Sequence, residues 1–321
     1  MRFVTRAALI FAALALSASH AFAQAPARIL SGFPPGGAVD VLARIFAEKW
    51  GEAIGRPVIV DTRTGATGQI ALEVLKAAAP DGNTVIVAPD SNIVVYPHTV
   101  AKPAFDTLRD FVPVAHVGRY DLALAIKTTL PANTLAEFLA WARANPKDAT
   151  YGTAGNGTLL HFYGLILGEE AKAPLSHVAY RGAGPAVTDL VGGHVTGAIL
   201  PLGTLVQQAR SGKVKILAIS GGQRSVIMPD VPTVKELGFP KLELSGWFGV
   251  FAPAATPADT VTKLNEIFRT AAHTPAVREK LLAAGLEPEN ISPAGLAAVV
   301  KRDYDRWGPV IKASGFTADS N

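Results

Sequence analysis

The sequence of 321 residues contains no cysteine. This absence excludes disulfide bonds and a lipid anchor on a cysteine, so the stability of the fold must come from its hydrophobic core. Charged residues are also few, at 17%, whereas hydrophobic residues make up 49%. This balance excludes a disordered chain and is typical of a globular protein with two domains or one large one.

Common motifs of catalysis and nucleotide binding are missing as well. The sequence has no G-x-G-x-x-G, no G-x-x-x-x-G-K-[ST], no G-x-S-x-G and no H-E-x-x-H, and its seven histidines form no close pair. No cluster of Lys and Arg alternates with aromatic residues, which argues against a nucleic-acid partner despite the net charge of +4. We therefore expect no catalytic residue, no metal and no cofactor, in a protein that is not an enzyme.

The only long apolar run lies at the N-terminus. Arg2 and Arg6 precede an apolar stretch from 7 to 16, and Ala21-Phe22-Ala23 follows as a small-residue cleavage site. This order predicts a signal peptide over residues 1–23, cleaved near Ala23, because the run is too short for a comfortable membrane span. Without a cysteine at that site, the mature protein is expected in the periplasm with no lipid anchor.

A turn rich in glycine and proline follows the first predicted strand. The apolar run 28–30 leads into Ser31-Gly32-Phe33-Pro34-Pro35-Gly36-Gly37-Ala38-Val39-Asp40, and a helical pattern covers residues 41–54. Unbonded N–H groups at the start of a helix point into such a turn, and the helix dipole favours negative charge there. The turn has no Lys, Arg or His, so the pattern predicts a loop that holds an anion through its backbone.

Alternation of short strands and helices continues along the chain. Predicted strands at 57–60 and 84–88 flank a helix at 67–79, which indicates βαβ units and a parallel sheet. The polar turn Pro89-Asp90-Ser91-Asn92 is expected at the same sheet edge as the first turn, where ligands of open α/β sheets bind. A capping box, Thr134 with Glu137, starts a later helix that ends near Ala144.

Two segments are expected to cross between domains. The runs 111–117 and 122–126 flank Gly118-Arg119-Tyr120-Asp121, and residues 242–251 form the return. Between them, strands at 150–152 and 175–180 feed the turns 153–157 and 181–184. Three helices close the chain, with a capping hydroxyl before proline at Thr256-Pro257, Thr274-Pro275 and Ser292-Pro293. We predict domain 1 over residues 24–120 and 245–321, domain 2 over 121–244, and a ligand cleft between them.

Five stretches together resemble the periplasmic receptors of tripartite tricarboxylate transporters, often called the Bug family. They are Phe33-Pro-Pro-Gly-Gly-Ala-Val-Asp40, Tyr151-Gly-Thr-Ala-Gly-Asn-Gly-Thr158 with His161, His177-Val-Ala-Tyr-Arg-Gly182 with Thr188-Asp189-Leu190, Met228-Pro-Asp-Val-Pro-Thr233 and Trp247-Phe-Gly-Val-Phe-Ala-Pro253. The resemblance implies an α/β protein with a two-domain periplasmic-binding-protein (Venus-flytrap) fold and two crossover strands. It also implies a receptor that captures a small carboxylate for the membrane permease subunits of a tripartite transporter. We expect it to act as a monomer.

The same resemblance implies which residues bind the ligand. One side of the cleft would consist of Phe33, Pro34, Gly36, Gly37 and Asp40, with Ser91 and Asn92 beside them. The other side would consist of Ala154, Gly155, Asn156, Gly157, Thr158, His161, Tyr180, Arg181 and Gly182.

Several of these residues have alternative roles. Asp40 fits a helix N-cap as well as a ligand contact, His161 fits a structural hydrogen bond, and Arg181 fits either a carboxylate clamp or a solvated loop. Asp90 would repel an anionic ligand, so either its side chain points away or the ligand also carries a positive group. The family's usual Arg-Pro-Gly-Ala-Gly-Gly is here Arg63-Thr64-Gly65-Ala66-Thr67-Gly68, which predicts a different conformation for that loop.

Two other functions are compatible with these patterns. One is a sensor that presents a carboxylate to a membrane histidine kinase, since the same fold serves transport and sensing. The other is a periplasmic hydrolase or isomerase, which the missing catalytic motifs disfavour.

Overall fold

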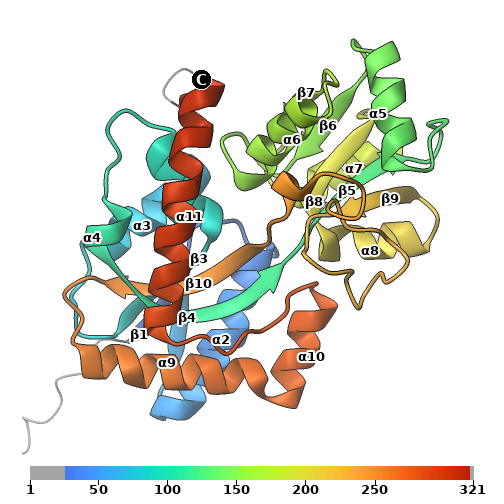
Figure 1. Ribbon diagram of the computed structural model, residues 1–321. Helices are drawn as coiled ribbons and strands as arrows, with labels where there is room; N and C mark the ends of the chain where they lie inside the picture. Colours follow the sequence, from blue (N-terminus) through green and yellow to red (C-terminus); the bar gives the residue numbers. More distant parts are fainter. Residues whose placement is uncertain (1–25, 319–321) are drawn as a thin grey trace, which may run out of the picture.

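The computed structural model describes residues 26–318, which form two five-stranded sheets covered by helices (Figure 1). The strand orders are β2-β1-β3-β10-β4 in the first sheet and β7-β6-β8-β5-β9 in the second. We refer to the first sheet with its helices as the first unit, and to the second sheet with its helices as the second unit. The predicted signal peptide over residues 1–23 lies outside the described residues.

The first unit combines the start and the end of the chain. Strand β1 (Ala27–Ser31) pairs in parallel with β2 (Val58–Thr62) and β3 (Thr84–Pro89), as the βαβ pattern predicts. Strand β10 (Gly246–Pro253) is antiparallel and lies between β3 and β4 (Phe111–Tyr120). The returning segment is therefore a central strand of the first sheet, which explains why all eight of its residues are buried.

Helices α2 (Ala38–Ile54), α3 (Gln69–Lys76), α9 (Ala258–His273), α10 (Pro275–Ala283) and α11 (Pro293–Ser314) belong to this unit. Phe268 of α9 packs against Phe46 and Trp50 of α2, with ring centroids 5.7 and 5.6 Å apart. Short turns of helix connect the other elements: η1 (Ala66–Gly68), η2 (Ser91–Val95), η3 (Tyr96–His98) and α4 (Thr107–Asp110).

The second unit has a mixed sheet of β5 (Leu122–Lys127), β6 (Thr150–Thr153), β7 (Ser176–Ala179), β8 (Gly197–Pro201) and β9 (Val214–Ile219). Its helices are α5 (Leu135–Ala144), α6 (Leu159–Glu170), α7 (Ala183–Gly192) and α8 (Leu202–Arg210), with the short turn η4 (Pro240–Leu242). Most residues in the first turns of α6 are buried, and this explains why the helix is apolar on nearly every side.

The chain passes twice between the units. Strand β4 runs unbroken to Tyr120, and only Asp121 separates it from β5. The apolar runs therefore belong to nearly continuous strands, and the predicted turn at 118–121 shrinks to one residue. The segment after β9 returns through η4 to β10. The α/β class with two crossover strands is confirmed, whereas the exact domain limits remain predictions.

Helix starts test the predicted capping residues. Thr134 Oγ1 accepts a hydrogen bond from the Glu137 amide at 3.2 Å, and Ser292 caps α11 by accepting one from the Gly295 amide at 3.1 Å. Thr274 precedes α10 without a side-chain cap, and α9 begins one residue later than predicted, with Pro257 at its N-cap position. Two of the four predicted hydroxyl caps are therefore formed.

The units also touch away from the crossover strands. A Cβ atom placed on Gly203 of α8 would lie 2.2 Å from the carbonyl oxygen of Ala284, just after α10. Only glycine at position 203 permits this approach of two backbones. Over residues 26–318, the helices are too short or too polar to cross a membrane.

Candidate functional site

The loop after β1 presents its backbone at the start of α2. Residues 34–37 are exposed, and Gly37 is the N-cap residue without any side-chain cap. Asp40 lies in the first turn and is buried, and its Oδ2 accepts hydrogen bonds from the Gly36 amide at 3.0 Å and from Arg44 Nε at 2.9 Å. The hydrogen bond from Arg44 lowers the pKa of Asp40. The N-cap role considered for Asp40 is therefore wrong, because its carboxylate instead braces the turn from within the helix.

Two further loops of the first unit lie against this turn. A Cβ atom on Gly68 would be 3.0 Å from both Phe33 Cε2 and Asn92 Nδ2, which brings three loops to one point. Asn92 Nδ2 donates to the Thr67 carbonyl oxygen at 2.6 Å and so holds the loop of residues 65–68 against η2. The predicted candidates Phe33 and Asn92 are thus brought together.

The loop of residues 65–68 adds residues that the sequence did not single out as a site. Ala66 and Thr67 have φ angles of 44° and 53°, and Gly65 and Gly68 are also positive. Consecutive left-handed residues are costly for side chains larger than glycine and are concentrated at binding sites. A helix was predicted from Thr67, but α3 begins at Gln69 because this conformation breaks it. The departure from the family pattern at 63–68 was the available signal.

Buried polar atoms without a partner lie beside this loop. Both polar atoms of the Gln69 side chain and Oδ1 of Asn92 have no hydrogen-bond partner within residues 26–318. Oδ1 of Asp40 is also buried without a hydrogen-bond partner in this part of the chain. Buried polar atoms are nearly always paired, so these groups mark the loops as a place that accepts further hydrogen bonds.

The second unit contributes the loop between β6 and α6. Thr158 is the N-cap of α6, and its hydroxyl donates to the Gly155 carbonyl at 2.8 Å. His161 Nδ1 accepts a hydrogen bond from the Gly157 amide at 3.2 Å. Burial lowers the pKa of His161 to about 4, so the imidazole is neutral and its proton is on Nε2. The structural hydrogen bond considered for His161 is therefore present, and it shapes the loop.

A second histidine, His177, packs against His161 and supports the same loop. The rings of His161 and His177 stack with centroids 4.0 Å apart. His177 Nε2 is 2.7 Å from Thr153 Oγ1, which also donates to the Gly155 carbonyl at 3.0 Å. Burial lowers the pKa of His177 to about 3, so a neutral ring donates this bond. Both ends of the glycine loop are thus fixed by uncharged side chains.

Tyr180, Arg181 and Gly182 connect β7 to α7. The Tyr180 hydroxyl donates to Asp189 Oδ2 at 2.7 Å, and burial raises the pKa of Tyr180 to about 12. The Gly182 amide donates to the Ala154 carbonyl at 3.0 Å, which ties this loop to the glycine loop. Arg181 is exposed, and its side chain has no hydrogen bond or ion pair to any residue from 26 to 318. Its guanidinium is therefore available to an anion.

The loops of the two units meet directly. The Leu159 amide, in the first turn of α6, donates to Ser91 Oγ at 3.2 Å. A Cβ atom on Gly155 would lie 4.0 Å from Thr67 Cγ2. These contacts place the predicted candidates Ser91 and Gly155 of opposite units at the boundary between the units.

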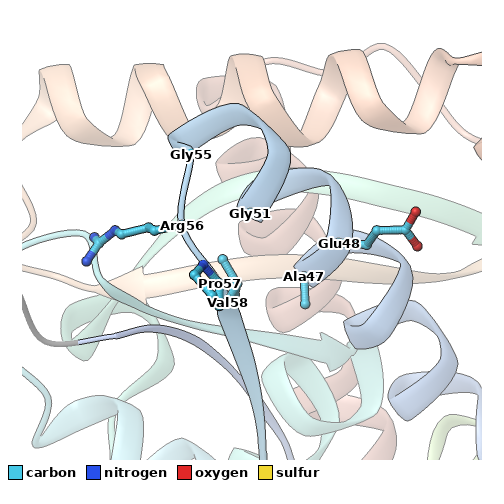
Figure 2. A pocket seen from close by; sticks show the side chains of 7 residues that line it. All are labelled: Ala47, Glu48, Gly51, Gly55, Arg56, Pro57 and Val58. Atoms are coloured by element: carbon cyan, nitrogen blue, oxygen red, sulfur yellow. The ribbon is translucent and has the colours of Figure 1, made fainter.

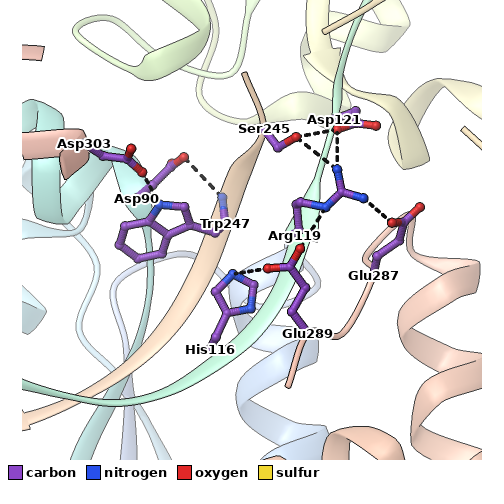
Figure 3. A network of polar contacts seen from close by, with 9 residues as sticks. All are labelled: Asp90, His116, Arg119, Asp121, Ser245, Trp247, Glu287, Glu289 and Asp303. Carbon is purple, nitrogen blue, oxygen red and sulfur yellow. Dashed lines mark hydrogen bonds and ion pairs between the residues drawn. The ribbon is translucent and has the colours of Figure 1, made fainter. Parts of the chain in front are cut away.

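Asp90 is buried beside this meeting point, and its carboxylate points toward the Trp247 backbone (Figure 3). Its carboxylate is 2% exposed and accepts hydrogen bonds from the Ser91 amide at 2.6 Å, the Tyr120 hydroxyl at 3.2 Å and the Trp247 amide at 3.2 Å. Burial raises the pKa of Asp90 to about 7. The side chain joins the two crossover strands to η2, which favours the first alternative for Asp90, a side chain that points away from the ligand.

Charged side chains surround the same crossover on its other side (Figure 3). Arg119 forms ion pairs with Asp121, Glu287 and Glu289, and Ser245 donates to Asp121 Oδ1 at 2.7 Å. Hydrogen bonds and ion pairs thus hold the point where the chain passes between the units.

The π-helical turn η2 begins directly after Asp90, where a simple polar turn was predicted.

Two surface hollows lie apart from the candidate residues. One, of about 470 Å³, is lined by residues 47–58 at the far end of α2 from the glycine turn (Figure 2). The other, of about 690 Å³, lies between α8 and α10. None of the predicted ligand residues lines either hollow. Within residues 26–318, no group of His, Asp or Glu is arranged to hold a metal ion.

Comparison with known proteins agrees with this geometry. A model of the tripartite tricarboxylate transporter family receptor matches residues 42–316. Protein BugT of Bordetella pertussis is 32% identical over 90% of this chain and 89% of its own. MatC of Rhodopseudomonas palustris, solved with bound malate, is 30% identical with a TM-score of 0.81, over 89% of this chain and 98% of its own.

A second solved structure, Rpa4515 of R. palustris with adipate, is 28% identical with a TM-score of 0.83, over 91% of this chain and 98% of its own. The resemblance that the five sequence stretches predicted is confirmed. The chain belongs to the tripartite tricarboxylate transporter receptor family.

Proposed function

We propose that this protein is a periplasmic receptor that binds a small organic acid between its two units and delivers it to the permease subunits of a tripartite tricarboxylate-type transporter. The observation that carries the proposal is that the glycine-rich loop at the start of α6 meets Ser91 and Thr67 of the first unit, whose loops lie beside Phe33 of the turn before α2. Both helix starts offer amide groups and a favourable dipole for an anion. The Leu159–Ser91 hydrogen bond joins the two sides.

The relatives support the ligand class. MatC was solved with malate and Rpa4515 with adipate, and both ligands carry two carboxyl groups. We propose a dicarboxylate or a related small acid, held by the predicted residues of both loops. We add Thr67 and Gln69 to that set, because Thr67 lies against Gly155 and the buried Gln69 amide has no partner within residues 26–318.

Charge balance favours an anionic ligand that spans both units. The turn at 34–37 offers only backbone donors, whereas Arg181 of the second unit adds a guanidinium without a protein partner in the described chain. Asp40 and Asp90 do not oppose the anion, since Asp40 is paired with Arg44 and Asp90 faces the crossover strands. One carboxyl group would bind the amide groups of the first turn, and the other would bind Arg181.

Binding would drive the two units together. A ligand that contacts both loops has more interactions in the closed arrangement than in an open one, and this difference in affinity shifts the population. The covalent connections at β4–β5 and β9–β10 permit rotation, while Asp90 keeps both crossover strands in register. The chemistry required is binding and release, so we propose that the protein is not an enzyme.

The test uses residues 24–321, the predicted mature protein, in a thermal-shift screen against mono-, di- and tricarboxylates. At a ligand concentration about 100-fold above Kd, the stabilisation expected is about 2.7 kcal/mol. The fully methylated ester of each active acid is the control, because it keeps the carbon skeleton and removes the charge. If no acid raises the melting temperature, the proposal fails. Conversion of a bound acid, followed by NMR, would show an enzyme instead.

A further inference from the structure

The C-terminal segment of residues 315–318, which we call the tail, leaves α11 and stays attached to the first unit. Gly315 ends the helix with φ at 66°, and the Phe316 amide donates to Ser314 Oγ at 3.2 Å. The Ala318 amide donates to the Thr99 carbonyl at 2.6 Å, just after η3. Phe316 is therefore fixed between two attachment points on the first unit.

The ring of Phe316 nevertheless contacts the second unit. It meets His161 edge-on with centroids 5.2 Å apart and Phe162 edge-on at 5.5 Å. A Cβ atom on Gly157 would lie 3.0 Å from Phe316 Cε1, so the ring rests on the backbone of the glycine loop. Figure 1 shows α11 rising along the first unit to this end of the chain.

The contact falls on the hydrogen bond that shapes the loop. Gly157 donates to His161 Nδ1, and Phe316 covers both the donor residue and the acceptor ring. Gly157 also has φ at 66°, a conformation that glycine reaches without strain but does not hold by itself. Packing of the Phe316 ring from the first unit therefore adds to the hydrogen bonds of Thr158 and His161 that hold this loop.

We infer that Phe316 is a positioning residue for ligand binding: from the first unit, its ring holds the Gly157–His161 part of the second unit in its binding form. The inference rests on the proposed function, because it concerns the same loop. The ring is partly buried and contacts His161 and Phe162 of the second unit, so its burial favours the closed arrangement. Since ligand binding and closure are linked, loss of the ring weakens ligand binding.

The first measurement compares ligand affinity in Phe316→Ala with the wild type, using an acid found in the screen. We expect Kd to rise about three- to tenfold, mainly through a faster dissociation rate. Phe316→Tyr should bind with an affinity close to that of the wild type, because its ring keeps the edge-on contacts to His161 and Phe162. The matched control is Tyr304→Ala on α11, whose ring packs at an angle of 52° against His98 within the first unit. It should lower the melting temperature without changing Kd.

The second measurement does not need a ligand. The chain has no cysteine, so Lys147→Cys and Lys263→Cys, exposed on the second and first units, accept a spin label each without side reactions. Phe316→Ala should shift the distance distribution between the labels to longer values, and Tyr304→Ala should leave it unchanged.

The outcomes separate the two proposals. If the wild type binds an acid and Phe316→Ala binds it equally well, the inference about Phe316 is overturned and the receptor function stands. If the wild type binds no acid, the receptor function fails, and an unchanged label distance in Phe316→Ala then overturns the inference independently. A longer distance that Phe316→Tyr reverses supports it in either case.

Discussion

The Leu159 amide donates a hydrogen bond to the Ser91 hydroxyl oxygen at 3.2 Å, and this bond joins the two units at the candidate site. The same hydroxyl donates to Asp90 Oδ1 at 3.3 Å. Ser91 therefore connects the first turn of α6 with the carboxylate that holds both crossover strands. If Ser91 binds the ligand as proposed, one side chain links the ligand site with the crossover strands.

Replacement of this hydroxyl should weaken ligand binding. In Ser91→Ala the Leu159 amide loses its partner from the first unit, and a hydrogen bond of this kind is worth about three- to tenfold in Kd. Calorimetric titration with an acid from the screen measures the change. Ser211→Ala is the control, because that exposed hydroxyl bonds only to the Gln208 carbonyl at the end of α8. Equal affinities in the two variants would contradict a role for the bond.

The glycine turn should be sensitive to backbone strain alone. Gly36 has φ at 84° and a Cβ atom there would meet nothing within 4 Å, so Gly36→Ala changes only the backbone preference. We expect the free energy of unfolding in urea to fall by about 1 kcal/mol. Gly184→Ala, in the first turn of α7 with equally open space, should be neutral. Similar losses in both variants would show that φ at Gly36 is not responsible.

Asp90→Asn should change how stability depends on pH. An aspartic acid in an unfolded chain has a pKa of about 3.9. Burial raises the pKa of Asp90 in the folded protein to about 7. Between these values the folded protein keeps a proton that the unfolded chain has lost. The contribution of Asp90 to the free energy of unfolding therefore decreases as pH rises from about 4 to 7, by about 1.4 kcal/mol per pH unit.

Asparagine does not titrate, so the difference between the two proteins measures this contribution. Asp90→Asn should be less stable overall, because its amide N–H faces another donor, but its deficit should shrink as pH rises from 4 to 7. Burial lowers the pKa of His116, His161 and His177, which makes stability rise with pH, and this effect is common to both proteins. Urea unfolding at several pH values measures the difference. If the difference in free energy of unfolding between Asp90→Asn and the wild type does not change with pH, this prediction is wrong.

Arg181 should contribute to affinity through its charge. We expect Arg181→Ala to raise Kd for a dicarboxylate by about tenfold or more, because a charge-assisted hydrogen bond is lost. The Kd of Arg181→Lys should lie between those of the wild type and Arg181→Ala, since lysine keeps the charge and loses the paired donors. The control is Arg143→Ala, an exposed arginine that donates to the Ala171 carbonyl elsewhere in the second unit. An unchanged Kd in Arg181→Ala would make it a solvated loop residue.

Much of the fold could be predicted from the sequence because local patterns specify it. Short apolar runs identified β1 and β3, and the Thr134–Glu137 pair identified the start of α5. Length and alternation could not show that β10 returns to the centre of the first sheet. That place depends on pairing with β3 and β4, whose residues are more than 120 positions away from β10, so no local pattern shows it.

The candidate site was predictable by segment and less so by side chain. Glycine-rich turns after strands pointed to both loops, since a turn at a helix start leaves a recognisable composition. The direction of a side chain depends on tertiary contacts, so Asp40 was expected at the N-cap position and is instead bonded back to Gly36. For the left-handed Ala66 and Thr67, the departure from the family pattern at 63–68 was the only signal, because neither residue type favours that conformation.

The approach of Gly203 to Gly285 limits how the protein can move. A Cβ atom on Gly285 would lie 2.4 Å from Gly203 Cα, so the two backbones have no room to come closer. A rotation that separates Ser91 from Leu159 must therefore turn about this contact or lift away from it. Even an alanine at position 203 would act as a wedge, and it would set the resting angle between the units before any ligand arrives.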